Sequence, residues 1–395
     1  MRVSLIKGGG GDSYYELGLL SGLIAQGIQV DFVGSERDDQ GHSDILRDRN
    51  VTFFALRGNQ DPQASLARKV LRILGYYARL WLYALKTSSR IFHIQWTERF
   101  AFYDRTILNL YYKLLGKKIV FTAHNVNAGE RDGRDGPMNR MTLRFMYRIV
   151  DRIIVHTEMM KQQLAGRFGV PAAKVTVIEH GINSMVPRTD LTPREARLRL
   201  GLPGDERVML FFGNITPYKG LEYLCAALAR LRETDRNLKL IIAGRITNRE
   251  NAAYWETIEA FISESELEGA LLRRTEFVPD DEIEIYFKAA DVLILPYRRI
   301  FQSGVLFLSY AFGLPVIAAD VGSLRGSIIE GKTGFLSRPE DAADLARTID
   351  GYFKSDLYKH LDCRRDEIVD YANRTYSWRT IGAKTKSVYD GLSRT

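Results

Sequence analysis

Short apolar runs that alternate with helical patterns are the feature that most constrains what this chain can fold into. In the first half, these runs cover residues 3–6, 30–33, 51–55, 91–94, 119–122, 153–156 and 175–178. They are nearly continuous in apolarity and rich in β-branched residues, which is typical of parallel strands covered on both faces. Helical segments such as 14–26 and 159–168 lie between them, so we predict a doubly wound α/β sheet.

The same pattern starts again after a polar bridge over residues 183–206, which contains Pro187 and a Gly-Leu-Pro-Gly sequence at 201–204. Further runs at 208–212, 238–242, 292–295 and 316–318 predict a second sheet, and a last helical pattern covers 377–392. A length of 395 residues suits two or three domains of roughly 100–200 residues each. We predict Rossmann-like domains over 1–188 and 189–376, followed by a helical segment over 377–395.

The net charge of +8 is unevenly distributed along the chain. Residues 1–190 hold 27 Lys and Arg against 18 Asp and Glu, so the whole basic excess lies in the first half. This asymmetry predicts an anionic partner for that half: nucleic acid, a membrane surface or a phosphorylated substrate. The charge is diffuse and no nucleic-acid-binding module is recognisable, which argues against nucleic acid.

Two segments of the first half, 66–90 and 140–152, interleave apolar and basic residues at helical spacing, and the first also carries several aromatic residues. One interpretation is an amphipathic helix lying on an anionic membrane. The other is a helix that covers the sheet and keeps its arginines in water. The membrane interpretation predicts a lipid-linked or membrane-borne acceptor and peripheral contact with the inner face of the membrane.

The cysteines and the apolar stretches indicate the compartment. Cys225 and Cys363 are the only cysteines, too few for a disulfide framework or a structural zinc site, so we predict a reducing cytoplasm. The first residues do not resemble a signal peptide. The uncharged stretch 300–319 is long enough to cross a bilayer, but Gly304, Gly313 and Pro315 favour a loop, a buried helix and a buried strand.

Loops that follow strands carry the candidate ligand contacts, because open α/β sheets bind ligands at the carboxyl ends of their strands. The first loop contains four glycines, including Gly10 and Gly11, ahead of a helix. It allows close approach of a ligand and favours anions, or it is a tight turn capped by Asp12 or Ser13. Ser13 stands where a dinucleotide fingerprint has its third glycine, and no P-loop ending follows.

A histidine, His124, follows the strand predicted at 119–122. Such a residue binds a sugar hydroxyl or polarises a reacting centre, or it is a structural histidine with satisfied hydrogen bonds. His93, His156 and His180 also follow strands, and the first two fit structural roles better. No pair of histidines has the spacing of metal ligands, so we predict no metal site.

Two loops of the second half contain groups that favour the binding of an anion, namely a lysine and the N–H groups at a helix start. Lys219 precedes a helix after strand 208–212 and is either a clamp for a diphosphate or an exposed lysine in a turn. In the loop after strand 292–295, Ser303 and Gly304 place N–H groups at a helix start, where an anion or a hydroxyl can bind.

These residues and their order resemble glycosyltransferase family 4, the retaining group with the GT-B fold, in which two Rossmann-like domains face each other across a cleft. The matching segments are 122–125 (Thr-Ala-His-Asn), 155–158, 177–182, 212–220, 242–245, 277–279, 290–296, 311–318 and 331–335. The resemblance covers nearly the whole chain and is most specific in the second half.

The resemblance implies that the second domain binds a nucleotide-sugar donor and that the final helix crosses back to the first domain. Lys219 would hold the donor diphosphate, with Gly10 and Gly11 reaching it, and His124 would contact the donor sugar. The other implied donor contacts are the backbone of Gln302, Ser303, Gly304 and Val305, and Phe277, Val278 and Arg245 around the base. No Asp-x-Asp motif occurs, so we expect no cofactor and no obligatory metal.

The sequence departs from the family pattern at three places. Asn214 occupies the position of an arginine in the phosphate loop, and Ile300 and Leu308 occupy the positions of two glutamates. No Asp or Glu occurs from residue 292 to residue 319. Arg298 or Arg299 could replace the missing cation in space.

We therefore predict a metal-independent retaining hexosyltransferase that uses UDP-glucose or a related UDP-hexose. Its acceptor would be a glycan or a lipid-linked molecule in polysaccharide or glycoconjugate biosynthesis. The alternatives are a catalytically degenerate nucleotide-sugar-binding or regulatory protein on the same scaffold, and a nucleotide-sugar epimerase. An oxidoreductase is disfavoured, because neither domain carries the dinucleotide fingerprint.

Overall fold

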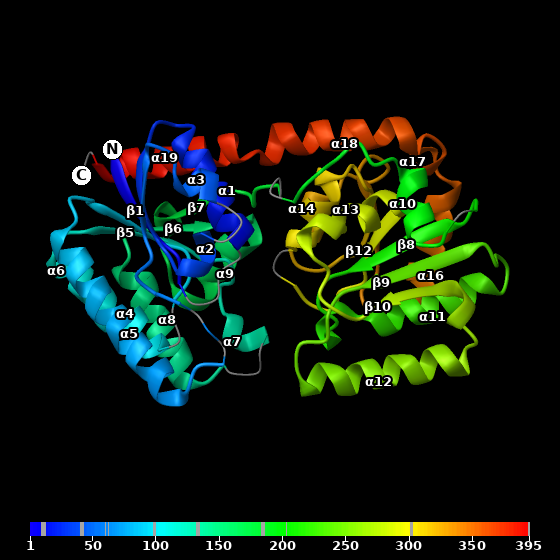
Figure 1. Cartoon of the computed structure of the whole chain (residues 1–395), viewed down its shortest axis with the longest axis horizontal. Coiled ribbons are helices and arrows are strands. Elements are labelled where there is room, and N and C mark those ends of the chain that lie inside the picture. Colours follow the sequence, from blue (N-terminus) through cyan, green and yellow to red (C-terminus); the bar gives the residue numbers. More distant parts are fainter. Residues whose placement is uncertain are drawn as a thin grey trace. The chain divides into compact units, whose positions relative to one another are not determined.

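The computed structural model describes residues 1–8, 13–39, 43–59, 61, 63–97, 100–131, 135–182, 186–202, 204–300 and 303–393. The chain forms two compact units. Unit 1 comprises Met1–Gly181 with Tyr376–Thr395, and unit 2 comprises Ile182–Thr375. In Figure 1, each unit is a sheet with helices around it.

Unit 1 is built on a seven-stranded parallel sheet in the order β3-β2-β1-β4-β5-β6-β7. Its inner strands bury the apolar side chains that predicted them, whereas those of the edge strand β3 are half-buried. The order reverses between β1 and β4, which makes their carboxyl ends a topological switch point. The strands are β1 Arg2–Ile6, β2 Gln29–Val33, β3 Val51–Phe54, β4 Ile91–Ile94, β5 Lys118–Thr122, β6 Arg152–Val155 and β7 Val175–Val177.

The helices of unit 1 include the last helix of the chain, α19, which packs on α1 through two glycines. A Cβ atom on Gly382 would lie 2.2 Å from the carbonyl oxygen of Gly22, so only glycine allows this approach. The helices are α1 Ser13–Ile24, α2 Glu36–Asp39, α3 Ser43–Leu46, α4 Leu66–Lys86, α5 Ala101–Arg105, α6 Ile107–Leu114, α7 Ala128–Arg131, α8 Pro137–Ile149, α9 Glu158–Phe168 and α19 Trp378–Ser393, with the short 3-10 helix η1 Ala172–Lys174.

Unit 2 is built on a six-stranded parallel sheet in the order β10-β9-β8-β11-β12-β13, with its switch point between β8 and β11. The strands are β8 Arg207–Phe212, β9 Leu238–Ala243, β10 Leu271–Arg274, β11 Val292–Leu295, β12 Val316–Ala319 and β13 Gly334–Ser337.

The core of unit 2 lies between this sheet and helices α11, α12 and α16, and includes Leu224, Leu228, Ile258 and Ile349. The helices are α10 Pro193–Arg199, α11 Leu221–Arg232, α12 Arg249–Glu264, α13 Asp280–Ala289, α14 Gly304–Ala311, α15 Leu324–Ser327, α16 Ala342–Lys354, α17 Asp356–Lys359 and α18 Leu361–Tyr376, with the 3-10 helices η2 Pro217–Lys219 and η3 Glu268–Ala270.

The predicted fold class is confirmed, and each predicted strand is present with its ends within one residue. The edge strands β10 and β13 were not predicted from the sequence. The bridge predicted at 183–206 contains a helix, α10, whose start is fixed by a capping box of Thr192 and Glu195. The uncharged stretch 300–319 includes α14 and β12. Among the described residues, no helix is both long and apolar enough to span a bilayer.

Candidate functional site

Lys219 lies at the switch point of unit 2, where two glycines let the chain turn tightly. β8 ends at Phe212, and Gly213 follows with φ of 91°. A Cβ on Gly213 would be 2.7 Å from Lys219 Nζ. Gly220 has φ of 67°, and a Cβ there would be 2.1 Å from the carbonyl oxygen of Pro296. Both positions therefore need glycine. The turn places Lys219 next to the carboxyl ends of β8 and β11.

Among the described residues, the Lys219 ammonium is buried without a counter-charge. The residue is 5% exposed, and Nζ donates a hydrogen bond to the Phe212 carbonyl at 3.1 Å. The rings of Phe211 and Tyr297 lie 5.6 and 5.9 Å from Nζ. No carboxylate in the described part of the chain pairs with it, and burial alone shifts its pKa. Burial lowers the pKa of Lys219 to about 7. An anion that reached this ammonium would relieve the desolvation.

The loop after β11 brings a helix N-terminus to the same place. Ser303 is buried, its Oγ is 3.2 Å from the Tyr297 hydroxyl, and α14 starts at Gly304. Val305 Cγ2 lies 3.6 Å from the position of a Cβ on Gly213, beside the Lys219 ammonium. The first N–H groups of a helix have no partner within the helix, so they add to the positive potential around Lys219.

An exposed aromatic ring and a guanidinium lie at the ends of β8, β9 and β10. Arg245 Nε donates to Asn214 Oδ1 at 3.3 Å, and the Arg245 guanidinium is 5.6 Å from the centre of the Phe277 ring. Phe277 is 60% exposed, whereas Val278 is buried. A large exposed aromatic ring beside a cation suits stacking with a flat heterocycle. The predicted residues Asn214, Lys219 and Arg245 thus lie on neighbouring loops at the carboxyl ends of the unit 2 strands.

The hypothesis that Arg298 replaces the missing arginine is not supported. Its guanidinium forms an ion pair with Glu222 and lies over the Tyr223 ring. Arg299 is exposed. Leu308, at the position of one absent glutamate, is buried in α14. The sequence could not reveal the Arg298–Glu222 pair, because those residues are 76 positions apart.

Two histidines that follow neighbouring strands of unit 1, His124 after β5 and His156 after β6, form a hydrogen-bonded pair that defines a tautomer. His156 Nδ1 is 2.9 Å from the Ile178 carbonyl, which can only accept. The neutral His156 ring must therefore accept at Nε2, which is 3.1 Å from His124 Nδ1. The proton on His124 then lies on Nδ1, so its Nε2 carries the lone pair. That atom is buried and has no partner among the described residues.

Burial and the neighbouring histidines keep the His124 ring neutral. Burial first, and then His156, His180 and His93, hold the pKa of His124 well below its usual value. Burial lowers the pKa of His156 to about 3. His124 Nε2 is therefore a hydrogen-bond acceptor over the physiological pH range.

Trp96, which the sequence analysis did not single out, stacks on His124 with ring centroids 4.4 Å apart and planes 5° apart. Its indole N–H is also buried without a partner among the residues described. An unused acceptor and an unused donor thus lie side by side near the switch point of unit 1. The only signal in the sequence was that Trp96 follows β4. Gly8 packs against the Trp96 backbone, where a Cβ would be 1.9 Å from its carbonyl oxygen.

Other candidate residues have structural roles or lie outside the described residues. His93 is fully buried and bonds Tyr389 at 2.6 Å and Thr122 at 2.7 Å, as the structural interpretation predicted. Gly10, Gly11 and Gln302 lie outside the residues that the structure describes. Within the described ranges, no group of three His, Cys, Asp or Glu residues is placed to hold a metal ion.

Comparison with known families gives two matches that together span most of the chain. The family model described as "Glycosyltransferase Family 4" matches residues 9–185. The model described as "Glycosyl transferases group 1" matches residues 194–372.

Curated relatives carry one recurring name. The D-inositol 3-phosphate glycosyltransferase of Streptosporangium roseum is 28% identical over 252 residues, which cover 62% of this chain and 55% of that protein. The chain thus matches about half the length of that relative. The enzyme of the same name from Corynebacterium aurimucosum is 24% identical over 97% of this chain and 92% of its own length.

Two solved structures illustrate the similarity in fold. Sucrose-phosphate synthase from Thermosynechococcus elongatus has a TM-score of 0.75 at 20% identity, with 100% of this chain and 99% of that chain covered. The Anabaena protein HepE in complex with UDP has a TM-score of 0.74 at 16% identity, with both chains fully covered.

Proposed function

The chain belongs to glycosyltransferase family 4 and has the GT-B fold, and from that premise we propose a retaining, metal-independent hexosyltransferase. Its donor is UDP-glucose or a related UDP-hexose, and its acceptor is a glycan or a lipid-linked molecule. The observation that carries this proposal is the buried Lys219 ammonium, which lacks a carboxylate partner among the described residues.

In the proposed reaction, unit 2 stabilises the diphosphate that leaves the sugar. Lys219 supplies a full positive charge, and the N–H groups at the start of α14 supply partial positive charge beside it. These groups are already fixed by the fold, so little reorganisation is needed as negative charge develops on the leaving oxygen. This local positive charge is the reason that we propose no obligatory metal.

The base of the donor has a proposed position beside Phe277, Val278 and Arg245. The exposed Phe277 ring offers a stacking surface, and the Arg245 guanidinium close to that ring adds a donor. Uracil is our choice of base, and the UDP named in the HepE complexes supports it.

Unit 1 contributes the proposed contacts to the hexose. His124 Nε2 accepts from a sugar hydroxyl, and the adjacent Trp96 N–H donates to a sugar oxygen. We assign Gly10 and Gly11 to the phosphates and Gln302 to a sugar hydroxyl as further proposals. Together these groups orient the sugar and hold the leaving diphosphate, which is where most of the rate enhancement is expected.

A nucleotide-sugar-binding protein without catalytic activity is the second candidate. It is favoured by the apolar residues Ile300 and Leu308, because no carboxylate from 292–319 can contact the donor. The proposed enzyme does not need those carboxylates if Lys219 and the helix N-termini hold the diphosphate.

Turnover of a panel of UDP-hexoses, with glycan and lipid-linked acceptors, tests the proposal. We expect nucleotide release with at least one UDP-hexose and a product whose anomeric configuration matches the donor. Binding without release for every pair would favour the non-catalytic protein. Recovery of an isomerised UDP-hexose with no transfer product would indicate an epimerase.

A further inference from the structure

Helix α4 of unit 1 is apolar on both its buried and its exposed sides. Its inner face buries Tyr76, Tyr77, Leu80, Tyr83 and Ala84. Its outer face exposes six large apolar side chains by 36% to 67%: Val70, Leu71, Leu74, Trp81, Leu82 and Leu85. At 100° per residue, these six fall within an arc of about 120° that faces away from the buried residues. The solvent side of a helix is normally polar, so a continuous apolar arc indicates a binding surface.

Helix α6 continues this surface beside α4. The Trp81 and Tyr111 rings stack with centroids 4.0 Å apart, and the Tyr111 hydroxyl donates to the Trp81 carbonyl at 3.0 Å. Ile107, Leu110 and Leu114 of α6 are 41%, 44% and 85% exposed and share one side of the helix. We call the exposed apolar residues of α4 and α6 the apolar face.

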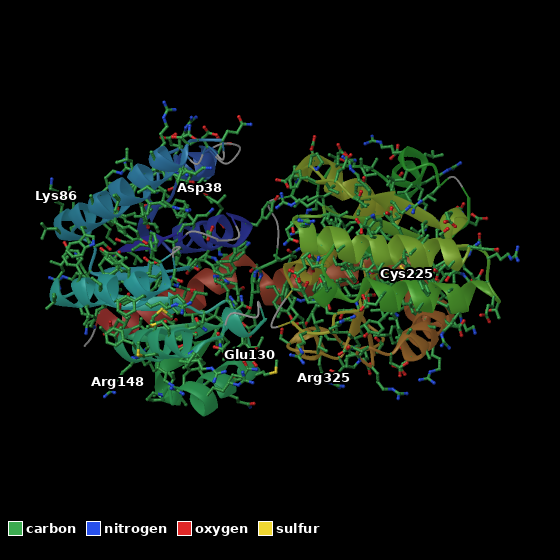
Figure 2. The ribbon with its side chains drawn as sticks, turned by 90° about the horizontal axis from the view of Figure 1, so that it is seen from below. Asp38, Lys86, Glu130, Arg148, Cys225 and Arg325 are labelled. Atoms are coloured by element: carbon green, nitrogen blue, oxygen red, sulfur yellow. The ribbon has the colours of Figure 1, made fainter. Side chains whose placement is uncertain are left out.

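Basic residues lie around the apolar face, and the helices that carry them contain no acidic residue. α4 carries five Lys or Arg residues, α6 carries one and the neighbouring α8 carries three, and none of the three helices contains Asp or Glu. Arg68, Arg79 and Lys86 lie along one edge of the apolar arc. α8 adds exposed Met138 and Met141 among its arginines. Figure 2 looks onto this side of unit 1, with Lys86 and Arg148 at its edges.

The surface is hollowed at the basic edge of the apolar face. A hollow of about 470 Å³ is lined by residues that include Arg79, Leu82 and Lys86, and also by Asp31, whose carboxylate is paired with Arg2. It combines cationic groups with an apolar side chain, which suits the phosphate and glycerol of a lipid headgroup.

We propose that the apolar face docks on a bilayer that contains anionic lipids. The apolar residues enter the boundary between headgroups and acyl chains, and the basic residues contact lipid phosphates. A second copy of the chain fits this face poorly, because it would bring the same basic helices together with no acidic group among them to pair with. This inference is independent of the proposed transfer reaction, since it concerns a different surface and a binding event that needs no donor.

Co-sedimentation of the full chain with vesicles tests this docking. We expect binding to vesicles of phosphatidylcholine with 30% phosphatidylglycerol, weak binding to phosphatidylcholine alone, and weaker binding at 500 mM than at 50 mM NaCl. Equal binding to both vesicle types, or no binding to either, would overturn the proposal.

Matched variants locate the surface. Leu74→Asp with Leu85→Asp should weaken binding about tenfold or more, whereas Leu198→Asp in unit 2, at a leucine that is 56% exposed, should not. Arg79→Gln with Lys86→Gln should also weaken binding about tenfold or more, and Arg230→Gln with Arg236→Gln should have little effect. Circular dichroism checks that each variant is folded. If folded Leu74→Asp/Leu85→Asp protein binds as wild type does, or loses only self-association, the proposal is wrong.

Discussion

Lys219 is the residue on which the proposed chemistry depends most. Its ammonium is held by a carbonyl and two aromatic rings rather than by a carboxylate. A buried cation of this kind adds no obvious stability to unit 2, which is what is expected of a group that awaits an anionic ligand.

Removing this cation should strongly lower transfer activity while the protein remains folded. We expect Lys219→Ala, and Lys219→Met with its longer side chain, to lower kcat/KM about 10²- to 10³-fold, because the leaving diphosphate loses its nearest full charge. Steady-state kinetics with UDP-hexose measures the effect. Lys332→Ala, at an exposed lysine of unit 2, is the control and should retain activity. Full activity in a folded Lys219 variant would contradict the assignment.

Above neutral pH, the binding of the donor should be coupled to the uptake of a proton by Lys219. The free protein has a Lys219 pKa of about 7, and a bound diphosphate would raise it. Below pH 7 the lysine is already charged, so affinity should be constant there. Above pH 7, affinity should fall by up to tenfold per pH unit, until the pKa of the complex is reached.

Calorimetry of UDP-glucose binding at pH 8, in buffers of different ionisation enthalpy, measures that proton directly. Lys219→Met should remove the linkage. A wild-type protein that binds UDP-glucose equally well at pH 6.5 and pH 8.5 would show that Lys219 does not titrate with the donor.

His156 is expected to position His124 rather than to touch the substrate. His156→Phe removes the acceptor that fixes the His124 proton on Nδ1, so kcat should fall roughly tenfold or more. His156→Gln, whose amide oxygen can accept, should restore part of the loss. Nitrogen NMR of labelled histidine should show an unprotonated Nε2 on His124 in the wild type and a mixture of tautomers in His156→Phe. An unchanged tautomer in that variant would refute this role.

At the level of elements, the contact between α1 and α19 depends on close backbone packing. In Gly382→Ala, the added Cβ would meet the Gly22 carbonyl, and overpacking of this kind costs about 1–3 kcal/mol of unfolding free energy. Gly391→Ala in the same helix has no atom within 4 Å and should gain up to about 1 kcal/mol from helix propensity. Urea denaturation compares the two, and equal effects would contradict the packing account.

The helices and strands could be predicted from the sequence more fully than the contacts between them. Buried strands such as β1 and β8 were predicted to within a residue, because both of their faces are apolar. β10 was missed because its sequence, Leu-Leu-Arg-Arg, is half basic and lies at the edge of the sheet. For α4, the sequence left two interpretations open, a cover for the sheet or a membrane helix. The inner tyrosines cover the sheet, and the outer leucines remain exposed.

The sequence could indicate candidate residues that carry their chemistry singly, and not contacts that two distant residues create. Lys219 was proposed from its position after a strand and from the family resemblance, and Arg245 from the resemblance alone. The stacking of Trp96 on His124 and the pairing of Arg298 with Glu222 depend on the fold. The assignments of Gly10, Gly11 and Gln302 stay predictions.

At the level of the whole molecule, the uneven charge of the sequence has a defined location. Much of the basic excess of the first half lies on α4, α6 and α8 of unit 1, around the apolar face. Most of the near-neutral second half forms unit 2, where single cations such as Lys219 and Arg245 are fixed at loops. This division fits a donor site that binds its ligand with a few positively charged side chains, and a separate membrane-docking surface that uses many basic residues.

A crystal structure of the chain with an intact UDP-hexose tests the central claim most directly. The account predicts the diphosphate within hydrogen-bond distance of Lys219 Nζ and of the N–H groups that begin α14, with uracil beside Phe277. A donor bound elsewhere, or a diphosphate at this position with Lys219 still turned to the Phe212 carbonyl and away from the phosphates, would contradict it.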